Sequence, residues 1–368
     1  MREFDYFFYL NSDPEALAGG ALNPRALMNG RTSAVLSAAL DGCGFDALRR
    51  TFGEEEIDRL VSAGFLRREG GAAYPAFPFF VREDAECLRA YCDHYAVRLA
   101  DALTGSLAAC REIVRTIDNG VAETVNLYHV LCGMVFDGAL FDCLSEAGLV
   151  ATHRRQPSGF DYILIAYEQC GELFEFANAL LCSYNRFTDG VCALESFGDA
   201  DGDRHDLYRF ARRIEAGGTT AAEEELCRLW HALGTDVKGT ILREAEALYR
   251  TGRCAPDARR LLEAFGYADG GGICVPVYGT AARKAADAMS EVVWRALEGE
   301  LRAALTGPRM LDALTCRRCG AAQSEVNNEL YHLLFGTVGG ELARRGVVAS
   351  PPHRPGEGRY LKAMEIDT

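Results

Sequence analysis

Two long stretches of the chain carry apolar side chains at steps of three and four residues, the spacing that places side chains on one face of an α-helix. The first covers residues 84–117, and its apolar positions are Leu88, Tyr91, Tyr95, Leu99, Leu103, Leu107, Cys110, Val114 and Ile117. The second covers residues 281–305, with Ala285, Met289, Val292, Ala296 and Leu301. Each pattern predicts one long helix whose apolar stripe lies in a core or a helix–helix seam. We therefore expect the two helices to pack together, as in a dimer formed within one chain.

A strand–turn–strand pattern follows a predicted helix that ends at Gly64. Residues 65–68 and 73–81 are expected to be strands, with Gly70 and Gly71 in the turn between them. Further helices are expected at residues 173–184, 220–233 and 241–249, and the acidic run at 197–206 is expected to be a linker. The predicted fold class is mainly α with short β-hairpins, that is, α+β.

One order of residues occurs twice. Leu-Tyr-His at residues 127–129 recurs at 330–332, and both copies continue with Gly, a short amphipathic helix, Gly-apolar-Val-Ala, His-Arg, Gly and Tyr. Phe77-Pro78-Phe79 likewise corresponds to Val275-Pro276-Val277. Such self-similarity predicts a duplicated unit, and the alternative is coincidence between Ala- and Gly-rich helices. The halves would be residues 1–196 and 207–368, joined by the linker 197–206.

The segment of residues 40–71, LDGCGFDALRRTFGEEEIDRLVSAGFLRREGG, resembles a small winged helix. The marks of the resemblance are Leu40-Asp41-Gly42, Leu48, Leu60 and the run Ala63-Gly64-Phe65-Leu66. Such modules occur in bacterial transcriptional regulators of the arsenic-repressor and multiple-antibiotic-resistance kind, and in the peptide-recognition modules of bacterial peptide-modifying systems. With the internal repeat, the resemblance implies four tandem modules related by a pseudo-two-fold axis, at about residues 31–82, 125–168, 220–279 and 325–366.

The wings of these modules carry the candidate binding residues. They are Arg67, Arg68, His153, Arg154, Arg155, His353, Arg354 and Arg359, with Lys362 close by. In DNA-bound winged helices the wing contacts phosphate or the minor groove while the preceding helix enters the major groove. The first such helix begins Glu54-Glu55-Glu56, and acids there repel phosphate. Solvated turn charge is therefore the alternative interpretation of these basic residues.

The composition argues against nucleic-acid binding and indicates a cytoplasmic protein. The chain has 368 residues and a net charge of −14, whereas a phosphate-binding protein normally presents a basic face. Its 14 cysteines are scattered mostly singly on apolar faces, which is typical of buried thiols in a reducing cytoplasm. The N-terminus carries early acids and no signal-like apolar run, and no stretch approaches the length of a membrane span.

Other candidate sites are weaker. Tyr128-His129 and Tyr331-His332 recur at matching positions and could line a cleft, although a helical His without a paired carboxylate is more often structural. Cys316 and Cys319 have the spacing of half a zinc knuckle, which Cys87, Cys92 and His94 would have to complete; the alternative is a pair of free thiols. We find no motif for catalysis and none for a cofactor.

Two hypotheses follow from these patterns. The first is a non-catalytic winged-helix protein that regulates transcription by binding DNA, with the wings on phosphate. The second is a winged-helix adaptor that binds a protein or peptide partner without DNA. In either case the chain would be a dimer-like unit in itself, with homodimerisation as a further option.

Overall fold

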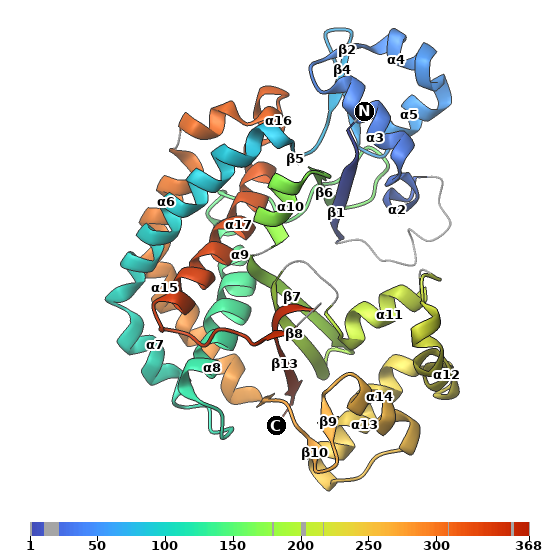
Figure 1. The fold of residues 1–368 in the computed structure, drawn as a ribbon. Helices are drawn as coiled ribbons and strands as arrows, with labels where there is room; N and C mark the ends of the chain where they lie inside the picture. The colour runs from blue at the N-terminus through green and yellow to red at the C-terminus, as the bar shows by residue number, and fades with distance from the viewer. Residues whose placement is uncertain are drawn as a thin grey trace. The chain divides into compact units, whose positions relative to one another are not determined.

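The computed structural model describes residues 2–10, 22–178, 180–199, 204–215, 217–307, 309–354 and 357–367 (Figure 1). Helices predominate and the strands form small sheets, which confirms the mixed α+β class. The chain divides into two compact units. Unit 1 contains Met1–Asp101, Leu140–Ala177 and Leu297–Thr337, and unit 2 contains Ala102–Ala139, Asn178–Ala296 and Val338–Thr368. This division interleaves the halves 1–196 and 207–368 that the sequence suggested, because each unit draws residues from both.

Unit 1 contains a module of four helices that ends in a β-hairpin. Its elements are α2 (Pro24–Leu27), α3 (Gly30–Ala39), β2 (Cys43–Gly44), α4 (Phe45–Phe52), α5 (Glu54–Ser62), β3 (Leu66–Glu69) and β4 (Ala72–Pro75). α5 ends as predicted, because Gly64 adopts a positive φ of 75° that glycine accepts readily. β4 pairs with β3 on one side and with the short β2 on the other. The apolar side of the helices, including Leu48, Ile57 and Leu60, is buried.

A second sheet and several helices complete unit 1. β6 (Tyr162–Glu168) lies between β1 (Phe4–Leu10), which runs antiparallel to it, and β5 (Phe79–Phe80), which runs parallel. The remaining elements are η1 (Arg82–Asp84), most of α6 (Ala85–Thr104), α9 (Leu140–Glu146), α10 (Gly171–Asn178), the end of α15 (Thr280–Thr306), η4 (Arg309–Ala313), α16 (Thr315–Arg318) and the start of α17 (Gln323–Arg344). The Tyr91 hydroxyl donates to the Ala304 carbonyl at 3.3 Å, and Arg98 pairs with Glu300 at 2.8 Å. These contacts confirm the predicted packing of the two long helices within unit 1.

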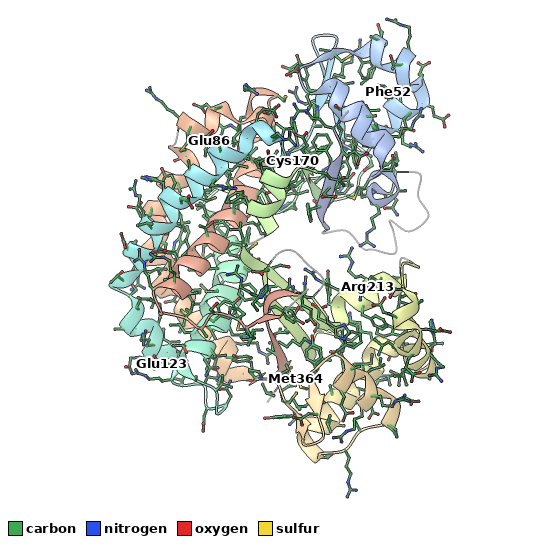
Figure 2. All side chains as sticks on the ribbon, in the orientation of Figure 1. Phe52, Glu86, Glu123, Cys170, Arg213 and Met364 are labelled. Carbon is green, nitrogen blue, oxygen red and sulfur yellow. The ribbon has the colours of Figure 1, made fainter. Side chains whose placement is uncertain are left out.

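Unit 2 is built on a sheet in the order β11–β13–β8–β7, with β12 beside β13. These strands are β7 (Leu181–Thr188), β8 (Cys192–Asp199), β11 (Val277–Tyr278), β12 (His353–Arg354) and β13 (Gly358–Ile366). One face of the sheet packs on a core of Leu194, Phe210, Ile241, Leu261 and further apolar residues. The helices of that core are α11 (Leu207–Glu215), α12 (Glu224–Ala232), α13 (Val237–Thr251) and α14 (Pro256–Ala264). Met364 on β13, labelled in Figure 2, is fully buried in it.

The other elements of unit 2 are a small hairpin and a group of helices. The hairpin consists of β9 (Ala268–Asp269) and β10 (Gly272–Ile273). The helices are α7 (Leu107–Val114), α8 (Glu123–Leu127), the π-helix η2 (Tyr128–Ala139), η3 (Ala221–Glu223) and the first part of α15. π-Helical turns are rare and occur frequently at functional sites. Among the described residues, one helix (Glu123–Glu146) has the length and hydropathy of a membrane span, and 61% of its most apolar window is buried inside the fold, as in a core helix.

Several predicted elements differ from the structure. The helix expected at 84–117 is interrupted at Gly105 and Ser106, where glycine disfavours a helix. The helix expected at 173–184 ends at Asn178, and β7 begins at Leu181 because its residues pair with β8 instead. The linker expected at 197–206 begins inside β8, which continues to Asp199; residues 200–203 lie outside the described part. In the second predicted wing a single bridge joins Arg155 to Asp161.

Candidate functional site

Arg154, a predicted DNA contact, is held inside unit 1. Its Nη1 donates to both carboxylate oxygens of Glu325, at 2.9 and 3.0 Å, and to the Ala76 carbonyl at 2.8 Å. Its Nη2 donates to the Gln156 side chain at 3.1 Å. Glu325 is only 4% exposed, so its carboxylate depends on Arg154 for a charged partner. Arg154 therefore anchors its loop to α17 and presents little charge to a ligand.

The other basic residues of unit 1 are also largely engaged. Arg67 pairs with Glu69, donates to the Cys319 carbonyl and lies over the Tyr74 ring. Arg68 is exposed and lies over the ring of Phe45, with its guanidinium carbon 4.9 Å from the ring centre. His153 is 3.3 Å from the Asp161 carboxylate, and Arg155 is exposed beside it. These contacts favour the solvated-turn interpretation for most of these residues.

In unit 2, Arg359 and Lys362 are likewise bound to other groups of the protein. The Arg359 guanidinium donates to Asp199 at 2.8 and 3.1 Å, and the Arg359 backbone N–H donates to it at 2.7 Å. Lys362 is buried, donates to the Phe265 carbonyl and lies over the Tyr267 ring. His353 is exposed at the start of β12, whereas the side chain of Arg354 lies outside the described part of the chain.

The first Tyr–His pair belongs to a buried polar cluster on the sheet of unit 2. His129, on η2, is 2% exposed and stacks on Tyr278 of β11, with ring centres 3.8 Å apart and planes 2° from parallel. Its Nε2 lies 3.5 Å from Glu195 of β8. Arg186 donates from Nε to Glu195 at 2.8 Å and from Nη2 to Glu365, and Arg283 donates to Glu365 at 3.0 Å.

Burial sets the protonation of this cluster. Desolvation, together with repulsion from Glu365, raises the pKa of Glu195 to about 7 although Arg186 opposes the shift. Desolvation and the charge of Arg186 lower the pKa of His129 to about 3. His129 is therefore neutral at neutral pH and serves as a packed aromatic ring. The structural interpretation of His129 is thus favoured, and Arg186, Glu195 and Glu365 are polar partners that sequence reasoning missed because they lie far apart in the chain.

The second Tyr–His pair lies in unit 1. The rings of Tyr331 and His332 contact Phe141 of α9, with ring centres 4.7 and 4.6 Å away. His332 Nδ1 lies 2.9 Å from the Asn328 carbonyl, and burial lowers the pKa of its imidazole. Because Tyr128 and His129 belong to unit 2, neither unit contains the predicted cleft lined by both pairs.

Cys316 and Cys319 are both buried, and the Cys319 thiol has a hydrogen-bond partner. Cys316 is fully buried, and desolvation raises its pKa to about 12. The Cys319 thiol donates to the Leu40 carbonyl at 2.7 Å, and Cys87 donates to the Met310 carbonyl at 3.2 Å. In the described part of the chain, no three His, Cys, Asp or Glu residues are grouped to hold a metal ion. The free-thiol interpretation is therefore favoured over the zinc site.

A cavity with a volume of about 600 Å³ lies in unit 2, and sequence reasoning did not find it. It is lined by Ile117, Asp118, Asn119, Val121, Tyr249, Ile273, Cys274, Val275, Pro276, Val277, Gly279 and Ala281. The run Ile-Cys-Val-Pro-Val at residues 273–277 was the available signal, because it places apolar residues directly after the glycine turn of a hairpin. Tyr249, on α13, is 45% exposed and forms part of the cavity wall.

Comparison with protein-family models, curated proteins and solved structures finds no match to this chain. The cavity, the paired arginines and the buried polar cluster around Glu195 are therefore the observations from which function is inferred.

Proposed function

We propose that this chain is a non-catalytic recognition protein, built from internally duplicated winged-helix modules, that binds a segment of a protein partner. The proposal places it in the cytoplasm, in keeping with 14 cysteines that are all free thiols. The winged-helix assignment rests on the three-helix module and hairpin of residues 30–75, and on the similar helix pair and hairpin of residues 237–273.

Duplication is supported by matching strand connections. In unit 1, β6 pairs parallel with β5 and antiparallel with β1. In unit 2, β13 pairs parallel with β11 and antiparallel with β8. The short strand that precedes each long helix, β5 before α6 and β11 before α15, is therefore the parallel neighbour in its sheet.

A second support is a pair of similar hydrogen bonds. The N–H of Ala151 donates to the Ser324 carbonyl, and the N–H of Ala349 donates to the Thr124 carbonyl, both at 2.9 Å. Each bond joins a Gly-apolar-Val-Ala segment to the first turn of the helix that carries a Tyr–His pair. In each case the two partners come from opposite halves of the sequence, as in two copies that have exchanged a helix.

The choice of a protein partner over DNA rests on the engagement of the wing arginines. Arg154 and Arg359 each neutralise a carboxylate that is under 10% exposed, Glu325 or Asp199. A DNA-binding protein gains affinity by releasing counterions from phosphates, which requires basic groups that are free to reach them. The chain also carries a net charge of −14. The cavity beside β10 supplies a surface of mixed apolar and polar groups, which a peptide segment can contact through both its side chains and its backbone.

Two measurements on the full-length protein test this proposal. In a fluorescence anisotropy titration with random-sequence duplex DNA, we expect no binding at low salt. In selection from a peptide-display library, we expect enrichment of a convergent set of sequences. DNA binding whose affinity falls steeply with salt, without convergent peptides, would identify a DNA-binding regulator and overturn the proposal.

A further inference from the structure

The backbone of Ile273 points its hydrogen-bonding groups away from its own hairpin. The N–H of Cys274 donates to the Tyr267 carbonyl at 3.0 Å, so Cys274 and Tyr267 form a hydrogen-bonded pair of the β9–β10 ladder. Such pairs alternate with non-hydrogen-bonded ones in an antiparallel ladder, and the next pair is Ile273 opposite Ala268. The N–H and C=O of Ile273 are therefore directed to the outer edge of β10.

In the hairpin of the first module, Ala73 of β4 corresponds to Ile273, and the strand β2 pairs with its outer edge. The N–H of Ala76 donates to the Phe65 carbonyl, which makes Ala73, three residues earlier, an outward-facing position of the β3–β4 hairpin. Cys43 of β2 pairs with Ala73. Among the described residues, β10 has β9 as its one partner strand, so the position that β2 fills in the first hairpin is open in the second.

The open edge lies along the cavity. Ile273 and the four residues after it line the cavity together with Ile117 and Val121 of the chain following α7, and with Tyr249 of α13. Asp118 is the one charged side chain among the described lining residues, and it is exposed. Asn119 donates to the Val277 carbonyl at 3.3 Å and exchanges hydrogen bonds with Asn126, which fixes this part of the wall.

We propose that the cavity receives an extended segment of a partner protein, which adds to the edge of β10 as β2 adds to β4. The proposal rests on the proposed function and names the site and the chemistry of its ligand. A strand at this edge hydrogen-bonds to Ile273 and directs every second side chain to one face. Those side chains contact the apolar wall of Ile117, Val121 and Tyr249, and a lysine or arginine of the segment lies next to Asp118.

The first experiment uses a display library of nine-residue peptides, selected on the full-length protein. The expected consensus has apolar residues at alternate positions and one basic residue. The selected peptide is then synthesised with a methyl group on one backbone nitrogen at a time. Because β10 has one outward-facing residue, whose carbonyl accepts from one amide of the segment, methylation should weaken binding about five- to tenfold at that amide and about twofold or less at its neighbours.

Variants of the protein locate the site. Ile273→Pro removes an N–H that the β9–β10 ladder does not use, and should abolish binding, whereas the matched control Ile273→Val keeps the N–H and should bind as wild type. Asp118→Asn should weaken a lysine-containing peptide about threefold and leave its glutamine counterpart unchanged. Bound peptide should also slow iodoacetamide alkylation of the exposed Cys274, with Cys43 of β2 as the reference thiol in the same molecule.

The outcomes separate the two proposals. Convergent peptides that show no single methylation-sensitive amide, do not protect Cys274 and bind Ile273→Pro as well as wild type would overturn the β10 site and leave the proposed function in place. Failure of the library to yield any convergent peptide would overturn both. One methylation-sensitive amide together with Cys274 protection supports the site even if Ile273→Pro does not fold.

Discussion

Replacing Arg154 by methionine tests whether this residue stabilises the fold or waits for a ligand. The change removes two hydrogen bonds to Glu325, one to the Ala76 carbonyl and one to the Gln156 side chain, and it leaves the Glu325 carboxylate, 4% exposed, without its charged partner. Breaking a buried ion pair from one side costs about 3–5 kcal/mol. The Arg154 side chain is 29% exposed, so water screens part of the pair and we expect a loss of about 2–3 kcal/mol.

The assay is urea denaturation followed by circular dichroism, with the free energy of unfolding obtained by linear extrapolation. The double variant Arg154→Met/Glu325→Gln should recover roughly 1–2 kcal/mol of the loss, because it no longer buries an unpaired charge. Arg155→Ala is the matched control, since this neighbouring arginine is exposed, and it should change stability by less than about 0.5 kcal/mol. A change below about 0.5 kcal/mol for Arg154→Met as well would refute the structural role and return Arg154 to the list of ligand-binding candidates.

Three further predictions concern the buried groups. Gly64→Ala should cost about 2–4 kcal/mol in the same denaturation assay, because φ is +75° and the new Cβ would lie 2.0 Å from Gln156 Oε1; an unchanged midpoint would contradict this. Glu195 has its pKa raised from 4.5 to about 7, so the folded state retains a proton that the unfolded chain releases, and this group's stability contribution is lost as pH rises between those values. Glu195→Gln should therefore make stability rise more steeply with pH in that window, as measured by urea midpoints across it, and an unaltered pH profile would exclude the shift. Treatment with a strong zinc chelator should leave the urea midpoint unchanged, because among the described residues no further His, Cys, Asp or Glu is grouped with Cys316 and Cys319 to hold a metal ion; a lowered midpoint would indicate a bound metal.

The sequence predicted the structure well where residues close together in the chain decide it. The helix that ends at Gly64, the strand after it and the glycine turn depend on glycines with positive φ and on nearby apolar residues, so they were predicted within a residue or two. The second strand was expected at 73–81 but ends at Pro75, because Phe79 and Phe80 pair with β6 instead. The second long helix, expected at 281–305, is α15 at Thr280–Thr306. The first was interrupted at Gly105, a residue that the apolar periodicity alone did not weigh.

Partners far apart in the chain decided the rest. Residues 181–184 were expected to end a helix, yet they form the start of β7 because this segment pairs with β8, with Arg186 opposite Glu195. The basic residues near the wings were visible in the sequence, but Arg154 finds Glu325 and Arg359 finds Asp199 only after the chain has folded.

The cavity shows the same division between local and tertiary information. The sequence determined that Ile273 follows a glycine turn in a hairpin, and the local ladder determined which way its N–H points. Only the tertiary structure brought residues 117–121 and Tyr249 beside that edge, where β10 has β9 as its one partner strand among the described residues. The physical reason is that strand pairing and ion pairing depend on distance in space, which a pattern along the chain does not contain.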